Sequence, residues 1–250
     1  MIPSLLALMW GLVAGSALVI GAGVGYFTQL PQRLVAAVMA FGSGVLISAL
    51  SLELMNEAYR RGGFDSTALG FVGGAAVFTV ANVLLARYGA QHRKRSGSRQ
   101  HSESEQEGSG IAIALGSLLD GIPEAVVIGV SMIANGKVSL VAVAAVFLSN
   151  VPEGLSSASG MKSAGRSKTY IFGIWTGIAL ACGAAAWAGY AVFSHYSNEV
   201  LAATNAVAAG AILAMLVDTM IPEAFETVHN FSGLIASLGF FCAFVLSKLS

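Results

Sequence analysis

The sequence predicts an all-α membrane protein with eight transmembrane helices, and three observations support this fold class. Hydrophobic residues make up 56% of the 250 residues and charged residues only 10%, which is too little charge to cover a soluble domain of this size. Apolar runs of about 20 residues, the length that crosses a bilayer core, recur along the chain. Basic residues lie between these runs or near their ends. We therefore treat 1–250 as a single transmembrane domain.

Eight runs have the length of a membrane-spanning helix, and loop signals separate them. The first lacks the basic start and the cleavage site of a secretory signal, so we expect it to remain in the protein. Gln-Leu-Pro-Gln-Arg precedes the second run, Arg-Arg-Gly-Gly the third, and Asn135-Gly136 the fifth. The predicted spans are 4–26, 34–57, 66–88, 110–133, 138–160, 170–193, 200–224 and 232–249.

The segment 89–109 interrupts this pattern. It is polar, low in complexity and free of large apolar side chains, which predicts a disordered loop. Placing this loop in the cytoplasm puts most basic residues on the inside, as membrane proteins prefer. With an even number of spans, both termini are then expected outside, in the cell (inner) membrane.

Acidic residues inside the apolar spans are the main functional signal. A carboxylate at mid-membrane costs several kcal/mol unless it is neutralised or paired. No span contains Lys or Arg at the same depth, so the predicted partner is a proton, a bound cation or water. We expect four of these residues to line a pathway: Glu53, Glu57, Asp218 and Glu223.

The fourth and fifth spans carry near-copies of one motif around Pro123-Glu124 and Pro152-Glu153. Proline inside a helix removes a backbone hydrogen bond and frees a carbonyl, which membranes tolerate where it faces a cavity or a ligand. Polar residues three or four positions before each Glu share its helix face. The two helices therefore offer a set of oxygen donors: Asp120, Glu124, Ser149, Asn150 and Glu153.

A weaker repeat relates the second span to the seventh. GVLISALSLELMNEAY matches GAILAMLVDTMIPEAF when Gly44 is placed on Gly210, and Glu57 then falls on Glu223. In the predicted topology these two helices run in opposite directions. Inverted repeats with kinked helices at mid-membrane are typical of secondary transporters. The expected organisation is three, two and three helices.

With these features the chain resembles the ZIP family of divalent metal-ion transporters. The resemblance covers nearly the whole chain and includes the string AAGAILAMLVDTMIPEA in the seventh span. It implies that Glu124, Asn150 and Glu153 are metal ligands, whereas Asp120 and Ser149 stand where the family usually has histidine. An all-oxygen set favours Mn²⁺ or Fe²⁺ over Zn²⁺. The metal is then a substrate, and no organic cofactor is expected.

Three other functions stay open at this point. One is a metal-dependent intramembrane hydrolase, although no HExxH or GxSxG string occurs. Another is a proton-coupled carrier of small organic cations, and the third is a ZIP-like homologue that does not transport. We expect a carrier rather than an enzyme. The net charge of zero indicates no nucleic-acid partner. Lipid and metal ions are the expected partners, and a homodimer is left open.

Overall fold

The computed structural model describes residues 2–90, 93–94, 100, 105, 109–133 and 136–249. These residues form helices and their connections, and they contain no strand. The α-helices are α1 (Pro3–Phe27), α2 (Gln32–Ala49), α3 (Met55–Ala86), α4 (Ser109–Ser131), α5 (Leu140–Ser163), α6 (Lys168–Phe193), α7 (Asn198–Met215), α8 (Ile221–Val228) and α9 (Ser232–Leu249). The described residues also form two short π-helices, η1 (Leu50–Leu54) and η3 (Leu216–Met220), and one 3₁₀ turn, η4 (His229–Phe231).

Six continuous helical stretches in the described part of the chain are long and apolar enough to cross a membrane. Four are single helices, and the others are Gln32–Ala86, with 55 residues, and Asn198–Leu249, with 52. A straight helix of 55 residues would be about 80 Å long, well over twice the thickness of a bilayer core. The architecture is that of a multi-pass helical membrane protein.

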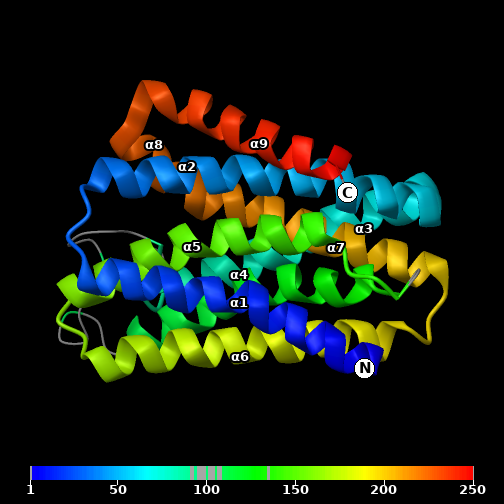
Figure 1. Cartoon of the computed structure of the whole chain (residues 1–250), viewed down its shortest axis with the longest axis horizontal. Helices are drawn as coiled ribbons and strands as arrows, with labels where there is room; N and C mark the ends of the chain where they lie inside the picture. The colour runs from blue at the N-terminus through cyan, green and yellow to red at the C-terminus, as the bar shows by residue number, and fades with distance from the viewer. Residues whose placement is uncertain are drawn as a thin grey trace.

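Each of the two longest stretches turns back at one residue with positive φ. Gly63 has φ 69° inside α3, a conformation that glycine adopts without a steric penalty. His229 has φ 44° between α8 and α9. After these residues the chain runs back along the bundle, so that α9 packs beside α2 and α3 packs beside α7 (Figure 1).

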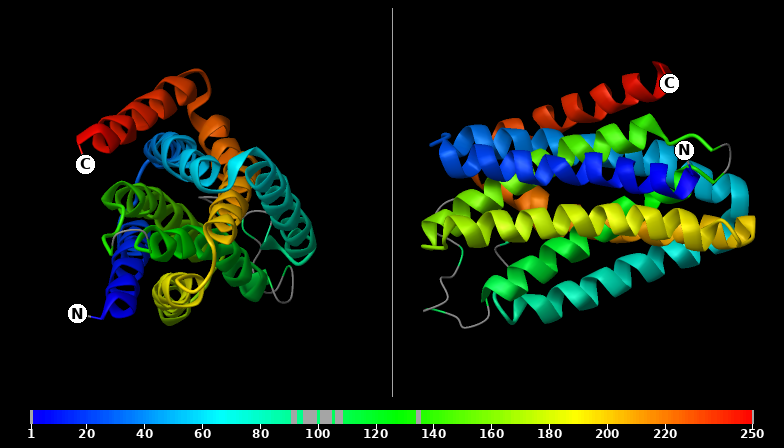
Figure 2. Two further views of the ribbon diagram at one scale, coloured as in Figure 1. Left: turned by 90° about the vertical axis from the view of Figure 1, so that its right-hand side faces the viewer. Right: turned by 60° about the horizontal axis from the view of Figure 1, so that its bottom comes forward.

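The helices form two groups. One contains α1, α4, α5 and α6, and the other contains α2, α3, α7, α8 and α9. Viewed along the bundle, α9 and α3 lie on the outside of the second group, and α1 and α6 lie on the opposite side of the molecule (Figure 2). The helices that carry the Pro-Glu motifs are in the first group and meet the second through α2 and α7. Both chain ends lie towards the same end of the bundle (Figure 1).

The repeat between the second and seventh spans has a structural counterpart. Gly44 and Gly210 are 166 positions apart, and η1 and η3 are separated by the same number of residues. Both helices therefore change to π geometry at equivalent positions of the repeat. The same separation relates Gly63 to His229, the two reversal points. Two matching irregularities at one register indicate that this part of the repeat is genuine.

Close glycine contacts repeat in the same way. A Cβ on Gly44 of α2 would lie 1.8 Å from a carbonyl oxygen of α9, and a Cβ on Gly239 of α9 would lie 2.1 Å from one of α2. Gly210 of α7 and Gly74 of α3 make the equivalent contacts at 1.9 and 2.0 Å. Small residues let helix backbones approach closely in lipid. The pairs α2–α9 and α7–α3 are thus packed by one geometry.

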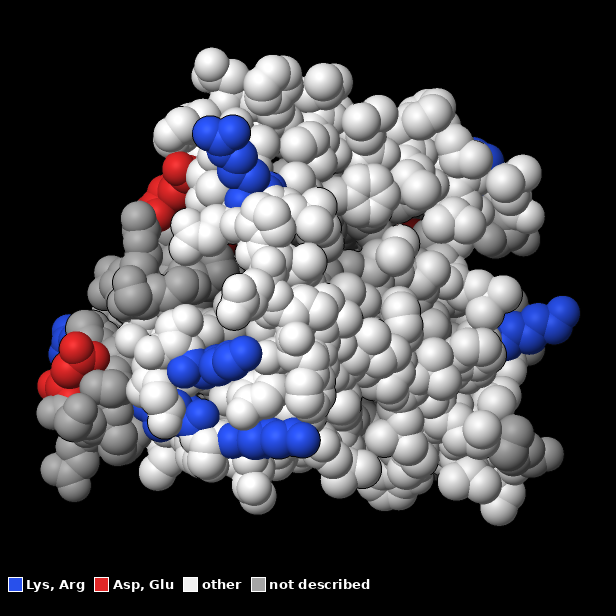
Figure 3. All heavy atoms as spheres, turned by 60° about the vertical axis from the view of Figure 1, so that its left-hand side comes forward, with Lys and Arg blue, Asp and Glu red and all other residues white. Residues whose placement is uncertain are grey.

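The surface of the bundle is mostly uncharged. In the view of Figure 3, charged side chains gather towards one end, and a broad uncharged area separates them from a few at the other. Large apolar side chains are exposed on outward helix faces, for example Leu69 of α3 and Leu238 of α9 at 76% and 56%. Exposed apolar area of this extent marks contact with lipid or with other apolar partners rather than with water.

Candidate functional site

Three buried carboxylates from the Pro-Glu helices lie at the centre of the molecule. Asp120 and Glu124 come from α4 and Glu153 from α5, and they are 1%, 1% and 3% exposed. Pro123 and Pro152 both lie inside their helices. We call Asp120, Glu124 and Glu153 the carboxylate site.

Two basic side chains fill this site, which corrects the expectation that no Lys or Arg reaches this depth. The Arg93 guanidinium donates to both oxygens of Asp120, from Nε to Oδ2 at 2.9 Å and from Nη2 to Oδ1 at 2.8 Å. Lys94 Nζ lies 3.2 Å from Asp120 Oδ2 and 3.0 Å from Glu153 Oε2. Burial lowers the pKa of Lys94, but the charges of Asp120 and Glu153 raise it by more, so its net pKa is raised.

This basic pair belongs to the predicted polar loop 89–109. Most of that loop lies outside the described residues, but Arg93, Lys94 and Gln100 are buried at 1%, 2% and 4% exposure. These residues lie outside the apolar spans that carry the Pro-Glu motifs, so the motifs alone do not indicate them. The requirement for charge neutrality does indicate them, because buried carboxylates need cationic partners. The densest run of basic residues in the sequence is Arg93-Lys94-Arg95.

Glu124 is the exception within the carboxylate site. Both of its carboxyl oxygens are buried and have no hydrogen-bond partner among the described residues. Its nearest charged neighbours are Glu153, Lys94 and Asp120. An unsatisfied buried carboxyl group is rare and costly, and such groups in native structures call for a functional explanation.

The other two predicted ligands direct their side chains to backbone carbonyls. Ser149 Oγ donates to the Val146 oxygen of its own helix at 2.9 Å. Asn150 Nδ2 donates to the Ala14 oxygen of α1 at 3.1 Å. Among the residues that the structure describes, no group of three or more His, Cys, Asp or Glu side chains could hold a metal ion. The predicted five-residue oxygen shell is not assembled here, and its role in metal binding stays a prediction.

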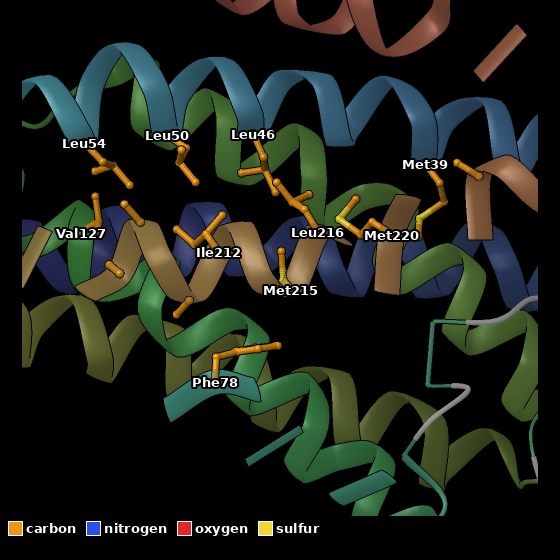
Figure 4. Close-up of a cluster of buried hydrophobic side chains, with 14 of the residues drawn as sticks. Met39, Leu46, Leu50, Leu54, Phe78, Val127, Ile212, Met215, Leu216 and Met220 are labelled. Carbon is orange, nitrogen blue, oxygen red and sulfur yellow. The ribbon is translucent and has the colours of Figure 1, made fainter. Parts of the chain in front are cut away.

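An apolar constriction lies beside Glu124. Leucines of α2 and η1 point towards Ile212 of α7 and Val127 of α4 (Figure 4), and Val146 of α5 completes the ring. The cavity between them measures about 20 Å³, which has room for no more than about one water molecule. Apart from Glu53 and Glu124, the residues that line this cavity are apolar and give a hydrated ion no substitute for its water. The leucines are Leu46, Leu50 and Leu54.

A polar vestibule of about 300 Å³ opens on the other side of this constriction. Glu53 lines both spaces, and its Oε2 accepts a hydrogen bond from Ser139 Oγ at 3.4 Å. Glu57 also lines the vestibule and pairs with Arg61 at 2.5 Å. Vestibule, constriction and Glu124 are therefore contiguous, and two of the four predicted pathway residues lie along this route.

A second polar cavity, of about 430 Å³, adjoins the basic pair. It is lined by Arg93, Asn82 and Asp218, among others. Arg93 Nη1 donates to Asn82 Oδ1 at 2.8 Å, and Asn82 Nδ2 donates to Asp218 Oδ2 at 3.1 Å. The fourth predicted pathway residue, Glu223, is buried in α8 and lines neither cavity. The carboxylate site thus lies between two polar cavities, behind the constriction on one side and behind Arg93 on the other.

Fold and site together define a multi-pass helical membrane protein with a buried, proline-flanked carboxylate site between two polar cavities. Comparison with the known protein families and with the curated proteins found no match to this chain.

Proposed function

We propose that this protein is a secondary transporter that moves divalent metal cations across the cell membrane towards the cytoplasm. The proposed topology has eight spans and both termini outside. The vestibule beside Glu53 then faces outwards, and the cavity beside Asp218 faces the cytoplasm. The transported ion would bind at Asp120, Glu124 and Glu153, with Ser149 and Asn150 as neighbouring oxygen donors.

One observation carries this proposal: Glu124 is a buried carboxyl group without a hydrogen-bond partner among the described residues, and it lines a small cavity that adjoins a polar vestibule. A divalent ion inside a membrane must have its charge met by nearby anions. The carboxylate site supplies up to three. The carboxylates come from two neighbouring helices, each with an internal proline, and helices that contain proline at mid-membrane are typical of substrate sites in transporters.

The donor set indicates which ions to test first. The proposed ligands contain no histidine or cysteine, and oxygen-only sites suit Mn²⁺ and Fe²⁺ better than Zn²⁺. The lone thiol of α6, Cys182, is buried and forms part of no ligand group among the described residues.

Uptake of single ions into liposomes tests the proposal. We expect purified protein to take up Mn²⁺ and Fe²⁺, with Zn²⁺ competing only at higher concentration. Glu124→Gln and Glu153→Gln should each abolish most uptake, and the double variant should add little because the site acts as a unit. A Glu153→Gln variant that reaches the membrane and transports at the wild-type rate would reject the mechanism.

A second candidate is a ZIP-like homologue that does not transport. The basic pair favours it, because Arg93 and Lys94 hold Asp120 and Glu153 in ion pairs. The same uptake measurement separates the two candidates. A homologue that does not transport would give no flux of Mn²⁺, Fe²⁺ or Zn²⁺ above that of protein-free liposomes.

A further inference from the structure

The basic pair lies in a site whose shape fits it, in addition to the ion pairs. The stem of Arg93 lies against α4, where a Cβ on Gly116 would approach its Cδ to 2.5 Å. A side chain at position 116 would require the stem of Arg93 to shift. The head group then reaches Asp120 with two parallel hydrogen bonds, the geometry in which arginine binds a carboxylate most strongly.

The backbone of the pair is also held. Ser156 Oγ of α5 donates to the Lys94 carbonyl oxygen at 2.5 Å. Gln100 Nε2 donates both to the Arg93 carbonyl oxygen at 3.2 Å and to the Ser157 carbonyl oxygen at 3.1 Å. Both the main chain and the side-chain head groups of Arg93 and Lys94 are therefore held by specific contacts.

We propose that Arg93 and Lys94 act as a tethered dication, which fills the carboxylate site between turnovers and which a divalent ion must displace in order to bind. This inference rests on the proposed function. Asp120 and Glu153 are fully buried, so leaving them ionised without partners would be strongly unfavourable. The basic pair neutralises them with two positive charges. A divalent ion carries the same two charges, and one can therefore replace the other without changing the net charge of the site.

The dication is also an internal competitor. Because it is part of the same chain, its effective concentration at the site is high. The apparent affinity for an ion falls in proportion to the fraction of time that the site is open. The basic pair should therefore set the ion concentration at which transport begins.

Acylation of lysines in the purified full chain tests whether the pair occupies the site. An amine-reactive reagent followed by mass spectrometry reports each lysine separately, and the exposed Lys162, Lys168 and Lys248 serve as internal references. We expect Lys94 to react at least about tenfold more slowly than the references, since it is buried and paired with two carboxylates. Adding MnCl₂ should raise its reactivity with ion concentration and leave the references unchanged. A Lys94 as reactive as Lys168 without ions would overturn the proposal.

Uptake kinetics test the competition. Arg93→Gln/Lys94→Gln removes both charges of the pair, and Arg33→Gln/Lys168→Gln removes two charges from exposed positions. We expect the first variant to lower the KM for Mn²⁺ about tenfold and the second to leave it unchanged. An equal KM in both variants would contradict the competition, provided that both reach the membrane.

The two experiments also separate this inference from the proposed function. If Mn²⁺ releases Lys94 but no ion crosses the membrane, transport is rejected and displacement is supported. If Mn²⁺ is transported but Lys94 stays protected at ion concentrations that saturate uptake, displacement is rejected and transport is supported. The labelling experiment uses the wild-type chain, so it tests the displacement of the basic pair even where a variant fails to fold.

Discussion

Glu124 and Glu153 lie on neighbouring helices, but within the described part of the chain only Glu153 has an ion-pair partner, Lys94 at 3.0 Å. The two residues should therefore respond differently to the same substitution. Glu153→Gln takes one of two carboxylates away from a buried ammonium group. Glu124→Gln replaces a carboxyl group whose oxygens have no hydrogen-bond partner among the described residues.

We expect Glu153→Gln to destabilise the protein by about 1–3 kcal/mol, the cost of removing a partner from a buried charged group. Glu124→Gln should leave the stability unchanged or raise it. The thermal unfolding midpoint in detergent measures both, with wild-type protein as the reference. If the two midpoints fall equally, the pairing described for Lys94 is wrong.

At the scale of elements, the reversal points Gly63 and His229 form a matched pair. They occupy equivalent positions in the repeat and both have positive φ, at 69° and 44°. A side chain in this region of φ is strained, and glycine relieves the strain.

The strain at His229 predicts opposite effects at the two reversal points. We expect His229→Gly to stabilise the protein by about 0.5–1 kcal/mol and Gly63→His to destabilise it by about 1–3 kcal/mol. Chemical or thermal unfolding of the two variants side by side checks this. A stabilising Gly63→His, or a strongly destabilising His229→Gly, would show that the two turns are not equivalent.

The helices could be predicted from the sequence, because an apolar run of membrane length is recognised from the local sequence alone. The predicted spans fall largely on helix, in six continuous apolar stretches of the described residues, and the division into eight spans stays a prediction. The π-helices were not predicted, since the repeat that contains them shows no change of period at Leu50 or Leu216.

Glycine spacing shows where local reasoning stops. Gly11/Gly15 and Gly173/Gly177 both predict close helix packing. Gly11 and Gly15 of α1 do lie against α6, whereas a Cβ at Gly173 or Gly177 would meet nothing within 4 Å. The spacing is the same in both helices, and the arrangement of the bundle decides which pair of glycines packs against another helix. Local reasoning does not find the basic pair either, because its carboxylate partners Asp120 and Glu153 lie 26 or more positions along the chain.

At the scale of the whole molecule, the proposed orientation in the membrane can be measured directly. The connection before α6 should face the cytoplasm and the one before α7 should face outwards. Ser167 and Ser197 lie in these connections and are exposed. In a background without Cys182 and Cys242, a membrane-impermeant maleimide should label Ser197→Cys in intact cells.

Ser167→Cys should be labelled only after the membrane is opened. Because the two positions flank one helix, each is the control for the other. Labelling of Ser167→Cys alone in intact cells would invert the orientation and exchange the roles of the two cavities. Labelling of both would show that α6 does not cross the membrane.

The hydrogen bonds from Asp120 through Arg93 and Asn82 to Asp218 join α4 to α3 and η3. This series of hydrogen bonds has a consequence for the temperature dependence of the transport rate. Freeing Arg93 breaks its bonds to Asp120 and to Asn82 together, so the barrier should be largely enthalpic. We expect initial Mn²⁺ uptake by wild-type protein to rise about threefold or more for each 10 °C, as for other steps in which packed contacts open cooperatively. In Arg93→Gln/Lys94→Gln the same Arrhenius plot should be clearly shallower, and the two rates should converge on warming. The protein would then act as a thermally gated carrier whose activity is lowest in the cold.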